Sequence, residues 1–308
     1  MSKSLKNKAF VGSLLIGIAS ILWGLDGVVL TPQLNGHNIV FVVFLLHAIP
    51  FLLMNFFMYS RYKEIKLLNT RDKISLLLVS VLGGALGTIA IVKALFLVEF
   101  QPLSVVVLLQ KFQPIFAIIL AAIVLKEKLT KNFIIWVLLA VVAGYFLTFG
   151  VSVPSFSSDS TTINAMLLSL FAAFSFGSST VFSKNILAKV DYLTATFFRY
   201  GLTFLILLPF IIVMGLYADF KTLTTNNWII LLTIALTTGS GAILLYYYGL
   251  KYIKASASTL IELFFPISAI LFDYFINGNV MSIIQWFSAA IMIFAIIKAN
   301  SKNKKQEA

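Results

Sequence analysis

Ten long apolar runs separated by short polar segments dominate this sequence of 308 residues. A helix needs about 20 apolar residues to cross a bilayer, and each run comes close to that length. Because 60% of the residues are hydrophobic and only 11% are charged, a water-soluble surface cannot be formed. The sequence therefore predicts an all-α membrane protein with ten transmembrane helices over residues 10–30, 38–59, 74–97, 101–125, 132–149, 163–183, 192–216, 228–250, 255–276 and 282–299.

The basic residues indicate how the runs are oriented. If the N-terminus lies in the cytoplasm, the inner segments carry 19 of the 23 Lys and Arg residues, and the outer segments carry only Lys221. This asymmetry predicts that both termini are cytoplasmic. Residues 1–9 lead into the first run without a small-residue cleavage site, so we expect a retained first helix. The net charge of +12 thus reflects topology, and the pattern does not favour nucleic-acid binding.

The two halves of the chain repeat. Four landmarks recur at an offset of 152 or 153 residues, namely Gly24 with Gly177, His47 with Arg199, Pro114 with Pro266, and Glu127 with Asn279. The sequence therefore predicts one five-helix repeat over residues 1–150 and a second over 163–308, joined by an outer linker over 151–162. Because each repeat has an odd number of helices, the second is inverted relative to the first. Such repeats usually enclose a central cavity near the middle of the bilayer.

The most unusual stretches are LLQKFQPIF at 108–116 and LIELFFPIS at 260–268, where polar residues and a proline interrupt apolar runs. Proline lacks an N–H group, so Pro114 and Pro266 leave the carbonyls of Gln110 and Glu262 without their helical partners. We expect helix kinks there, and also at Pro50 and Pro209. In a bilayer the freed carbonyls need protein or water as partners. A kink with a purely architectural role is the alternative.

Ionisable and amide groups inside these runs are the candidate solute-binding residues, because charges in a bilayer are costly and usually functional. Lys111 lies about 15 Å deep at about 1.5 Å per residue. It is expected to face the cavity with Gln110, Gln113 and Glu262; the alternative is that Lys111 pairs with Glu262 or with a helix carbonyl. Glu262 is also a candidate for proton coupling.

Three further residues lie deep in their runs and complete the candidate site: Arg199, His47 and Trp23. Arg199 and His47 could donate hydrogen bonds to a solute, whereas Trp23 could stack on one. Each also has a structural alternative: Arg199 could extend its guanidinium to the interface, His47 could bond a backbone carbonyl, and Trp23 could serve packing. Asp26, Lys93 and Asp273 lie nearer the outer ends, and we interpret them as rim residues.

Several function classes are disfavoured. The chain has no cysteine and two histidines, and it contains neither a His-Glu-x-x-His site nor the paired aspartates of an intramembrane enzyme. We therefore predict no catalytic residues, no metal site and no cofactor. The loops are too short for a soluble partner-binding domain, so the expected partners are the lipid bilayer and a small solute, with a homodimer left open.

The motifs Trp23-Gly24, Phe176-Gly177, FFRY at 197–200, KYIKASASTL at 251–260 and LKEKLT at 125–130 resemble the drug/metabolite transporter superfamily, in particular its ten-helix EamA-type bacterial members. The resemblance covers essentially the whole chain. It implies two five-helix repeats around a central cavity in a bacterial cytoplasmic membrane, and a role in moving metabolites. The chain departs from a charge-symmetric repeat, because His47 corresponds to Arg199 and Asn279 to Glu127.

The charges inside the runs bear on the solute. Three cations face three carboxylates, namely Lys93, Lys111 and Arg199 against Asp26, Glu262 and Asp273. This balance favours a zwitterionic or uncharged solute such as an amino acid, carried by a secondary transporter with alternating access. A passive facilitator or channel, and an exporter of amphipathic cationic drugs, are the alternatives.

Overall fold

The computed structural model describes residues 3–99, 109–152 and 160–306, and these residues are helical with short connections and no strand. Nine helical segments among them are long and apolar enough to cross a membrane: Asn7–Leu34, Ile39–Leu67, Thr70–Leu97, Lys131–Phe149, Ser160–Leu187, Tyr192–Val213, Thr225–Tyr252, Ala255–Asn277 and Ile283–Asn300. They correspond to nine of the ten runs. The prediction of an all-α membrane protein is therefore confirmed.

The fourth predicted run, 101–125, lies partly outside the described residues, and Gln113–Val124 is the apolar helix that the structure describes there. Most of the predicted linker over 151–162 also lies outside them.

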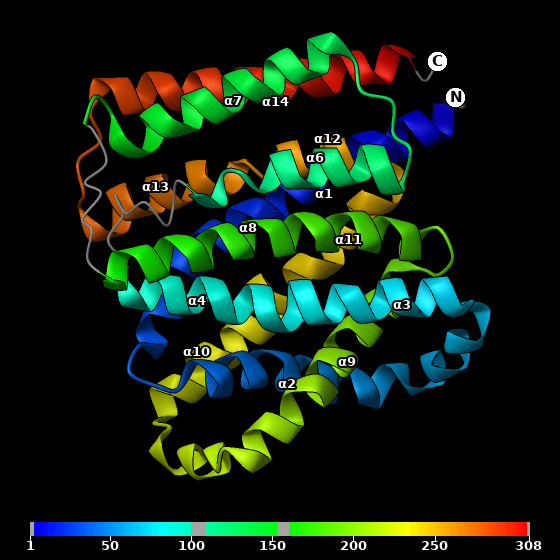
Figure 1. The fold of residues 1–308 in the computed structure, drawn as a ribbon, viewed down its shortest axis with the longest axis vertical. Helices are drawn as coiled ribbons and strands as arrows, with labels where there is room; N and C mark the ends of the chain where they lie inside the picture. The colour runs from blue at the N-terminus through cyan, green and yellow to red at the C-terminus, as the bar shows by residue number, and fades with distance from the viewer. Residues whose placement is uncertain (1–2, 100–108, 153–159, 307–308) are drawn as a thin grey trace.

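Within each described range, the helices follow one another along the chain with short connections (Figure 1). Their bounds are α1 Lys3–Leu25, α2 Ile39–Met58, α3 Thr70–Leu78, α4 Gly87–Leu97, α6 Gln113–Val124, α7 Lys131–Phe149, α8 Ser160–Leu187, α9 Tyr192–Val213, α10 Thr225–Ile234, α11 Ser240–Tyr252, α12 Ala255–Ile261, α13 Phe264–Asn277 and α14 Ile283–Gln306. Short 3₁₀ turns cover Thr31–Leu34, Tyr59–Leu67 and Leu216–Thr222. Large apolar side chains such as Phe57, Val213 and Phe287 are exposed on the outside of the bundle, as a lipid-facing surface requires.

Among the described residues, wide π-helical turns interrupt three of the long segments. Two of them lie at matching places in the two halves. Val79–Leu86 joins α3 to α4, and Ala235–Gly239 joins α10 to α11. Gly87 directly follows the first turn and Gly239 ends the second, and they are 152 residues apart. A Cβ atom at Gly239 would lie 2.8 Å from the carbonyl oxygen of Ile234, and a Cβ at Gly87 would contact the carbonyl of Leu82 in the same way. Both wide turns therefore depend on a residue without a side chain.

The helices pack in pairs that match between the halves. Helix α1 packs against α11 and α13, whereas α8 packs against α4 and α6; α2 lies along α9, and α7 lies along α14 at one end of the bundle (Figure 1). At closest approach, a Cβ on Gly24 of α1 would lie 2.8 Å from the amide nitrogen of Ala269. A Cβ on Gly177 of α8 would lie 2.9 Å from that of Ala117. Two glycines, 153 residues apart, thus permit equivalent contacts.

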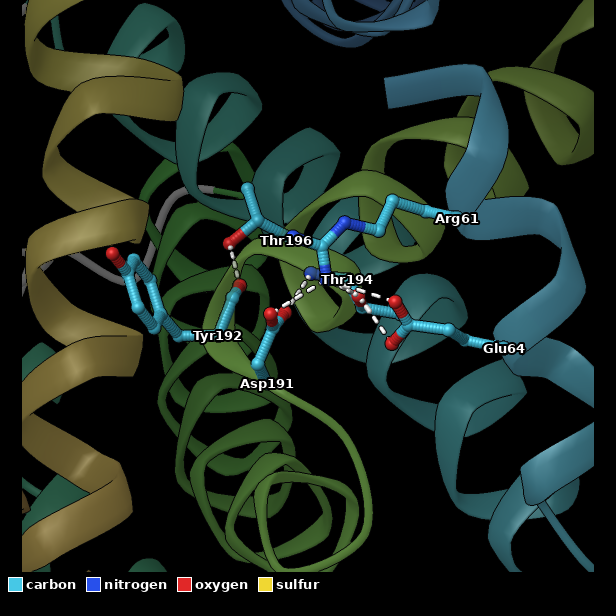
Figure 2. Close-up of polar contacts among 6 residues, drawn as sticks. All are labelled: Arg61, Glu64, Asp191, Tyr192, Thr194 and Thr196. Atoms are coloured by element: carbon cyan, nitrogen blue, oxygen red, sulfur yellow. Dashed lines mark hydrogen bonds and ion pairs between the residues drawn. The ribbon is translucent and has the colours of Figure 1, made fainter. Parts of the chain in front are cut away.

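A polar cluster fastens the segment after α2 to the start of α9 (Figure 2). The guanidinium of Arg61 lies 2.6 Å from the carboxylate of Asp191 and 2.8 Å from that of Glu64. Thr194 donates its hydroxyl to Glu64 over 2.7 Å and its backbone N–H to Asp191 over 2.8 Å. Asp191 is the N-cap of α9. Burial acts to raise the pKa of Asp191, but the hydrogen bonds from Thr194 and Arg61 outweigh it and hold this pKa below its ordinary value.

Candidate functional site

A cavity of about 270 Å³ lies among α1, α2, α4, α8, α9 and α11 and the residues around the starts of α6 and α13. Six of the seven residues that the sequence marked as candidates line it: Trp23, His47, Gln110, Gln113, Arg199 and Glu262. They come from both halves of the chain. The structure therefore brings these six side chains together, and their role in solute binding stays a prediction.

Two helices are interrupted beside this cavity, just before Pro114 and Pro266. The chain is helical at 109–110 and again from Gln113, and it is helical up to Ile261 and again from Phe264. In the second break the carbonyl of Glu262 accepts a hydrogen bond from the N–H of Phe265 over 2.9 Å. The carbonyl that Pro266 leaves without an i+4 partner thus accepts a hydrogen bond from the N–H group three residues later.

The other two prolines have a different setting. Helix α2 continues through Pro50 and α9 continues through Pro209. Kinks at these two positions stay a prediction.

Glu262 is the centre of a hydrogen-bond network that joins several helices. Its Oε1 accepts from the hydroxyl of Tyr246 over 2.8 Å, and its Oε2 accepts from Nε2 of Gln113 over 2.6 Å. The Tyr246 hydroxyl also lies 2.8 Å from Oγ1 of Thr180. Both carboxylate oxygens therefore accept hydrogen bonds, one from α6 and one from α11. The side chain of Glu262 is 9% exposed.

Lys111 lies apart from this network. Its Nζ donates to the carbonyl oxygen of Gly144 over 2.7 Å and to the hydroxyl of Thr148, both in α7. The side chain is 3% exposed and does not line the main cavity. It lines a smaller cavity of about 30 Å³, which Glu262 also borders. Of the arrangements considered from the sequence, the structure has the contact with a helix carbonyl.

Arg199 carries a fixed positive charge at the cavity. Its Nη1 donates to the hydroxyl of Tyr247 over 3.1 Å, and its Nη2 donates to the carbonyl of Gly83 over 2.9 Å. The Nε atom is buried and has no hydrogen-bond partner among the described residues. A guanidinium has five N–H donors, so Arg199 retains donor capacity for a bound molecule.

Two aromatic pairs form walls of the cavity. The rings of Trp23 and Tyr246 lie 5.4 Å apart between centroids, and those of His47 and Tyr200 lie 5.2 Å apart. Nδ1 of His47 lies 2.8 Å from the carbonyl oxygen of Val43. A carbonyl only accepts, so this nitrogen carries the proton, and in the neutral ring Nε2 is the acceptor.

Sequence reasoning missed part of the lining. Asp26 was expected at the rim, yet it lines the cavity together with Thr31 and Thr238. Its position three residues after Trp23 was the available signal, because residues three apart share a helix face. The other two expected rim residues lie outside the cavity lining: Lys93 is exposed, and Asp273 is buried and accepts hydrogen bonds from Asn277 and Asn279.

Comparisons with known proteins match both halves of the chain to one family. The model of the EamA-like transporter family matches residues 10–149 and 163–300. The riboflavin transporter ImpX of Fusobacterium nucleatum is 50% identical over 293 residues, which are 95% of this chain and 98% of that protein. An uncharacterized transporter of Archaeoglobus fulgidus is 22% identical over 134 residues, 44% of this chain and 47% of that one. A solved crystal structure with 13% identity superposes with a TM-score of 0.64 and covers all of both chains, which shows a shared fold.

Proposed function

Because this chain belongs to the EamA-like transporter family, we propose that it carries riboflavin, or a flavin of the same shape, across a bacterial cytoplasmic membrane. The observation that carries the proposal is the 50% identity over nearly the whole chain to a bacterial riboflavin transporter. The chain is a multi-pass membrane transporter and not an enzyme. The balance of cations and carboxylates in the apolar runs favoured an amino acid as the solute. The same balance suits any uncharged solute, so we propose a flavin in place of an amino acid.

The cavity lining supports a flavin by its chemistry. Riboflavin combines a flat aromatic ring system, a polar edge of carbonyl and N–H groups, and an uncharged chain of hydroxyls. Aromatic side chains line the cavity on several sides: Trp23, Phe176, Tyr200, Tyr246 and Phe265. Offset-stacked or edge-to-face contacts between a flat ring and such side chains lower the free energy of binding. A mostly apolar site with few polar groups is typical of small-molecule pockets.

Polar groups are available for the other parts of the molecule. Arg199 lines the cavity, and its described hydrogen bonds use two of its five N–H donors, so its guanidinium is a donor for a flavin carbonyl. Gln110 and Gln113 line the same cavity. Thr31 borders the cavity and offers a hydroxyl oxygen to the hydroxyl chain. Because two carboxylates and one guanidinium line the cavity, a phosphorylated flavin is expected to bind more weakly than riboflavin.

We further propose ten transmembrane helices arranged as two inverted five-helix repeats that work by alternating access. The matched packing of α1 with α13 and of α8 with α6 supports the repeat. Both termini are then cytoplasmic, as the basic residues favour. With this topology the lining includes Arg199, Tyr246 and Glu262 from the inner halves of their helices and extends to Thr31 and Leu95 at the outer helix ends, so we propose that the cavity opens outward.

Polar ties on the proposed cytoplasmic side are consistent with an outward-facing state. The Arg61 and Asp191 pair holds the segment after α2 to the start of α9. The carboxylate of Glu127 accepts hydrogen bonds from the backbone N–H groups of Ala255 and Ser256 over 2.8 and 3.1 Å, which joins the end of α6 to the start of α12. Both contacts link the first half of the chain to the second, and an inward-facing state requires that they open or move together.

Binding tests the solute. Riboflavin is fluorescent, and stacking on Trp23 or Tyr246 is expected to quench it, so titration of purified protein should give a saturable signal. Unlabelled riboflavin should compete, whereas amino acids and amphipathic cationic drugs should not. Competition by a cationic drug without any riboflavin binding would favour the drug-exporter alternative and refute the flavin assignment.

A further inference from the structure

We propose that Asp26 is the proton-binding group that couples solute movement to a proton gradient, an inference that rests on the proposed transport function. Asp26 follows α1 directly and begins a π-helical turn over Asp26–Leu30. Its carboxylate borders the main cavity. The sequence pointed instead to Glu262 for this role, and the two carboxylates differ in how their oxygens are used.

The surroundings of Asp26 leave its carboxylate incompletely satisfied. Oδ1 accepts one hydrogen bond, from Oγ1 of Thr31 over 3.1 Å. Thr238, on the wide turn before α11, faces the same carboxylate. Its Oγ1 is buried, with the residue 1% exposed, and has no hydrogen-bond partner among the described residues. Buried polar atoms without a partner are uncommon, and a functional role or a bound water or ion often explains them.

Among the residues that the structure describes, no Lys or Arg forms an ion pair with the Asp26 carboxylate. Among the described residues, the ion pairs are those of Arg61 with Glu64 and Asp191, far along the chain from Asp26. The titratable groups facing this part of the cavity are His47 from α2, Arg199 and Tyr200 from α9, Tyr246 from α11, and Glu262 between α12 and α13. The cavity lining from α10 and α13 is Ile234 and Phe265, which carry no charge. An ionised carboxylate without a paired cation is costly inside a bilayer, and binding a proton removes that cost.

Glu262 cannot change its protonation state without disturbing other contacts. Tyr246 and Gln113 each donate to one of its oxygens, so a change at Glu262 disturbs ties between α6, α11 and the broken helix. Asp26 can gain or lose a proton with only the contact to Thr31 affected. Glu262 is therefore a positioning residue in this account, and Asp26 is the group that titrates.

A proton suits the Asp26 site better than a metal ion does. Hard metal cations usually take about six oxygen ligands, whereas the described residues place one carboxylate and the hydroxyls of Thr31 and Thr238 together here. A proton needs only one oxygen. In the outward-facing state, Asp26 takes one proton from the outer water; after reorientation it releases that proton inside. Each cycle moves one proton with one solute molecule, and nothing is oxidised or reduced.

The test uses purified full-length protein in proteoliposomes with radiolabelled riboflavin. With a pH difference of about one unit, acidic outside, one-to-one coupling allows up to about tenfold accumulation. Wild-type protein should accumulate riboflavin under this gradient, and Asp26→Asn should only equilibrate it. Counterflow, which exchanges riboflavin without net proton movement, should persist in Asp26→Asn. The matched control Asp273→Asn changes a buried carboxylate outside the cavity lining and should still accumulate riboflavin.

The outcomes separate the two proposals. If wild-type protein shows no riboflavin counterflow, the proposed function fails. If counterflow occurs but the pH gradient drives no accumulation, or if Asp26→Asn still accumulates riboflavin, the coupling role of Asp26 is refuted.

A measurement without any solute guards against a misfolded variant. Infrared difference spectra of wild-type protein between acidic and neutral pH should contain a protonated-carboxyl band that Asp26→Asn and Asp26→Glu lose or shift. An unchanged band in both variants would assign the proton to another group.

Discussion

The close approach of α1 to α13 predicts a specific steric effect of the substitution Gly24→Ala. The added Cβ would lie 2.8 Å from the amide nitrogen of Ala269 and 3.0 Å from the carbonyl oxygen of Phe265, and it would also contact the hydroxyl of Ser268. Two of these atoms belong to the backbone and cannot rotate away. The matched control is Gly17→Ala in the same helix, where the nearest atom is Cγ2 of Ile261 at 3.9 Å, an ordinary contact.

The expected magnitudes follow from two opposing effects. Overpacking costs about 1–3 kcal/mol, and the backbone contacts at residue 24 place the cost at about 3 kcal/mol. Replacing glycine by alanine in a helix contributes about 1 kcal/mol of stability at both positions. Gly24→Ala should therefore lose about 2 kcal/mol and Gly17→Ala should gain about 1 kcal/mol.

Thermal unfolding in detergent, followed by intrinsic fluorescence, measures this difference. At about 2 °C per kcal/mol for a chain of this size, Gly24→Ala should melt about 6 °C below Gly17→Ala. Gly177→Ala should behave like Gly24→Ala, since its Cβ would lie 2.9 Å from the amide of Ala117. A Gly24→Ala protein as stable as the Gly17→Ala protein would refute the described contact between α1 and α13.

Three further predictions follow from single contacts. The pKa of Asp191 is lowered in the folded protein, so its ionised carboxylate stabilises the folded state above its ordinary pKa of about 3.9. This stabilisation is lost as the pH falls through the lower, folded-state pKa. The melting temperature of wild-type protein should therefore drop more between pH 6 and pH 3 than that of Asp191→Asn. Trp23→Phe should weaken riboflavin binding by about fivefold in a fluorescence titration, through loss of about 1 kcal/mol of ring contact, whereas Lys111→Met should change it by less than about twofold because the amine is bound to α7. Glu127→Gln should lower the free energy of unfolding by about 1 kcal/mol, since the carboxylate accepts from Ser256 and caps α12; an unchanged melting temperature would contradict that role.

The spans and the approximate membership of the cavity could be predicted from the sequence, and the reason is the bilayer itself. Backbone groups in lipid must be satisfied internally, so an apolar run of sufficient length has no alternative to a helix. Polar residues such as Arg199 and His47 in such runs are driven toward the protein interior. The position of each polar residue along its helix, and hence its depth in the bilayer, was enough to predict that these residues lie near one another.

Side-chain direction could not be obtained in this way. Lys111 was expected to face the cavity, but its partner is set by the position of α7, which follows from the packing of α7 on α14 and leaves no trace in the local sequence. Asp26 was placed at the rim by its distance from the helix end. The π-helical turn over Ala235–Gly239 was not anticipated, and Thr238 reaches the cavity from it.

The most direct test of the account is counterflow of radiolabelled riboflavin into proteoliposomes preloaded with unlabelled riboflavin. A carrier with a single cavity that is reached alternately from each side should give rapid, saturable and transient uptake of label, and Trp23→Phe should require a higher riboflavin concentration for half-maximal exchange. Uptake that rises linearly with concentration and shows no transient accumulation would indicate a passive pore. Absence of any riboflavin exchange would contradict the assignment of the cavity to a flavin.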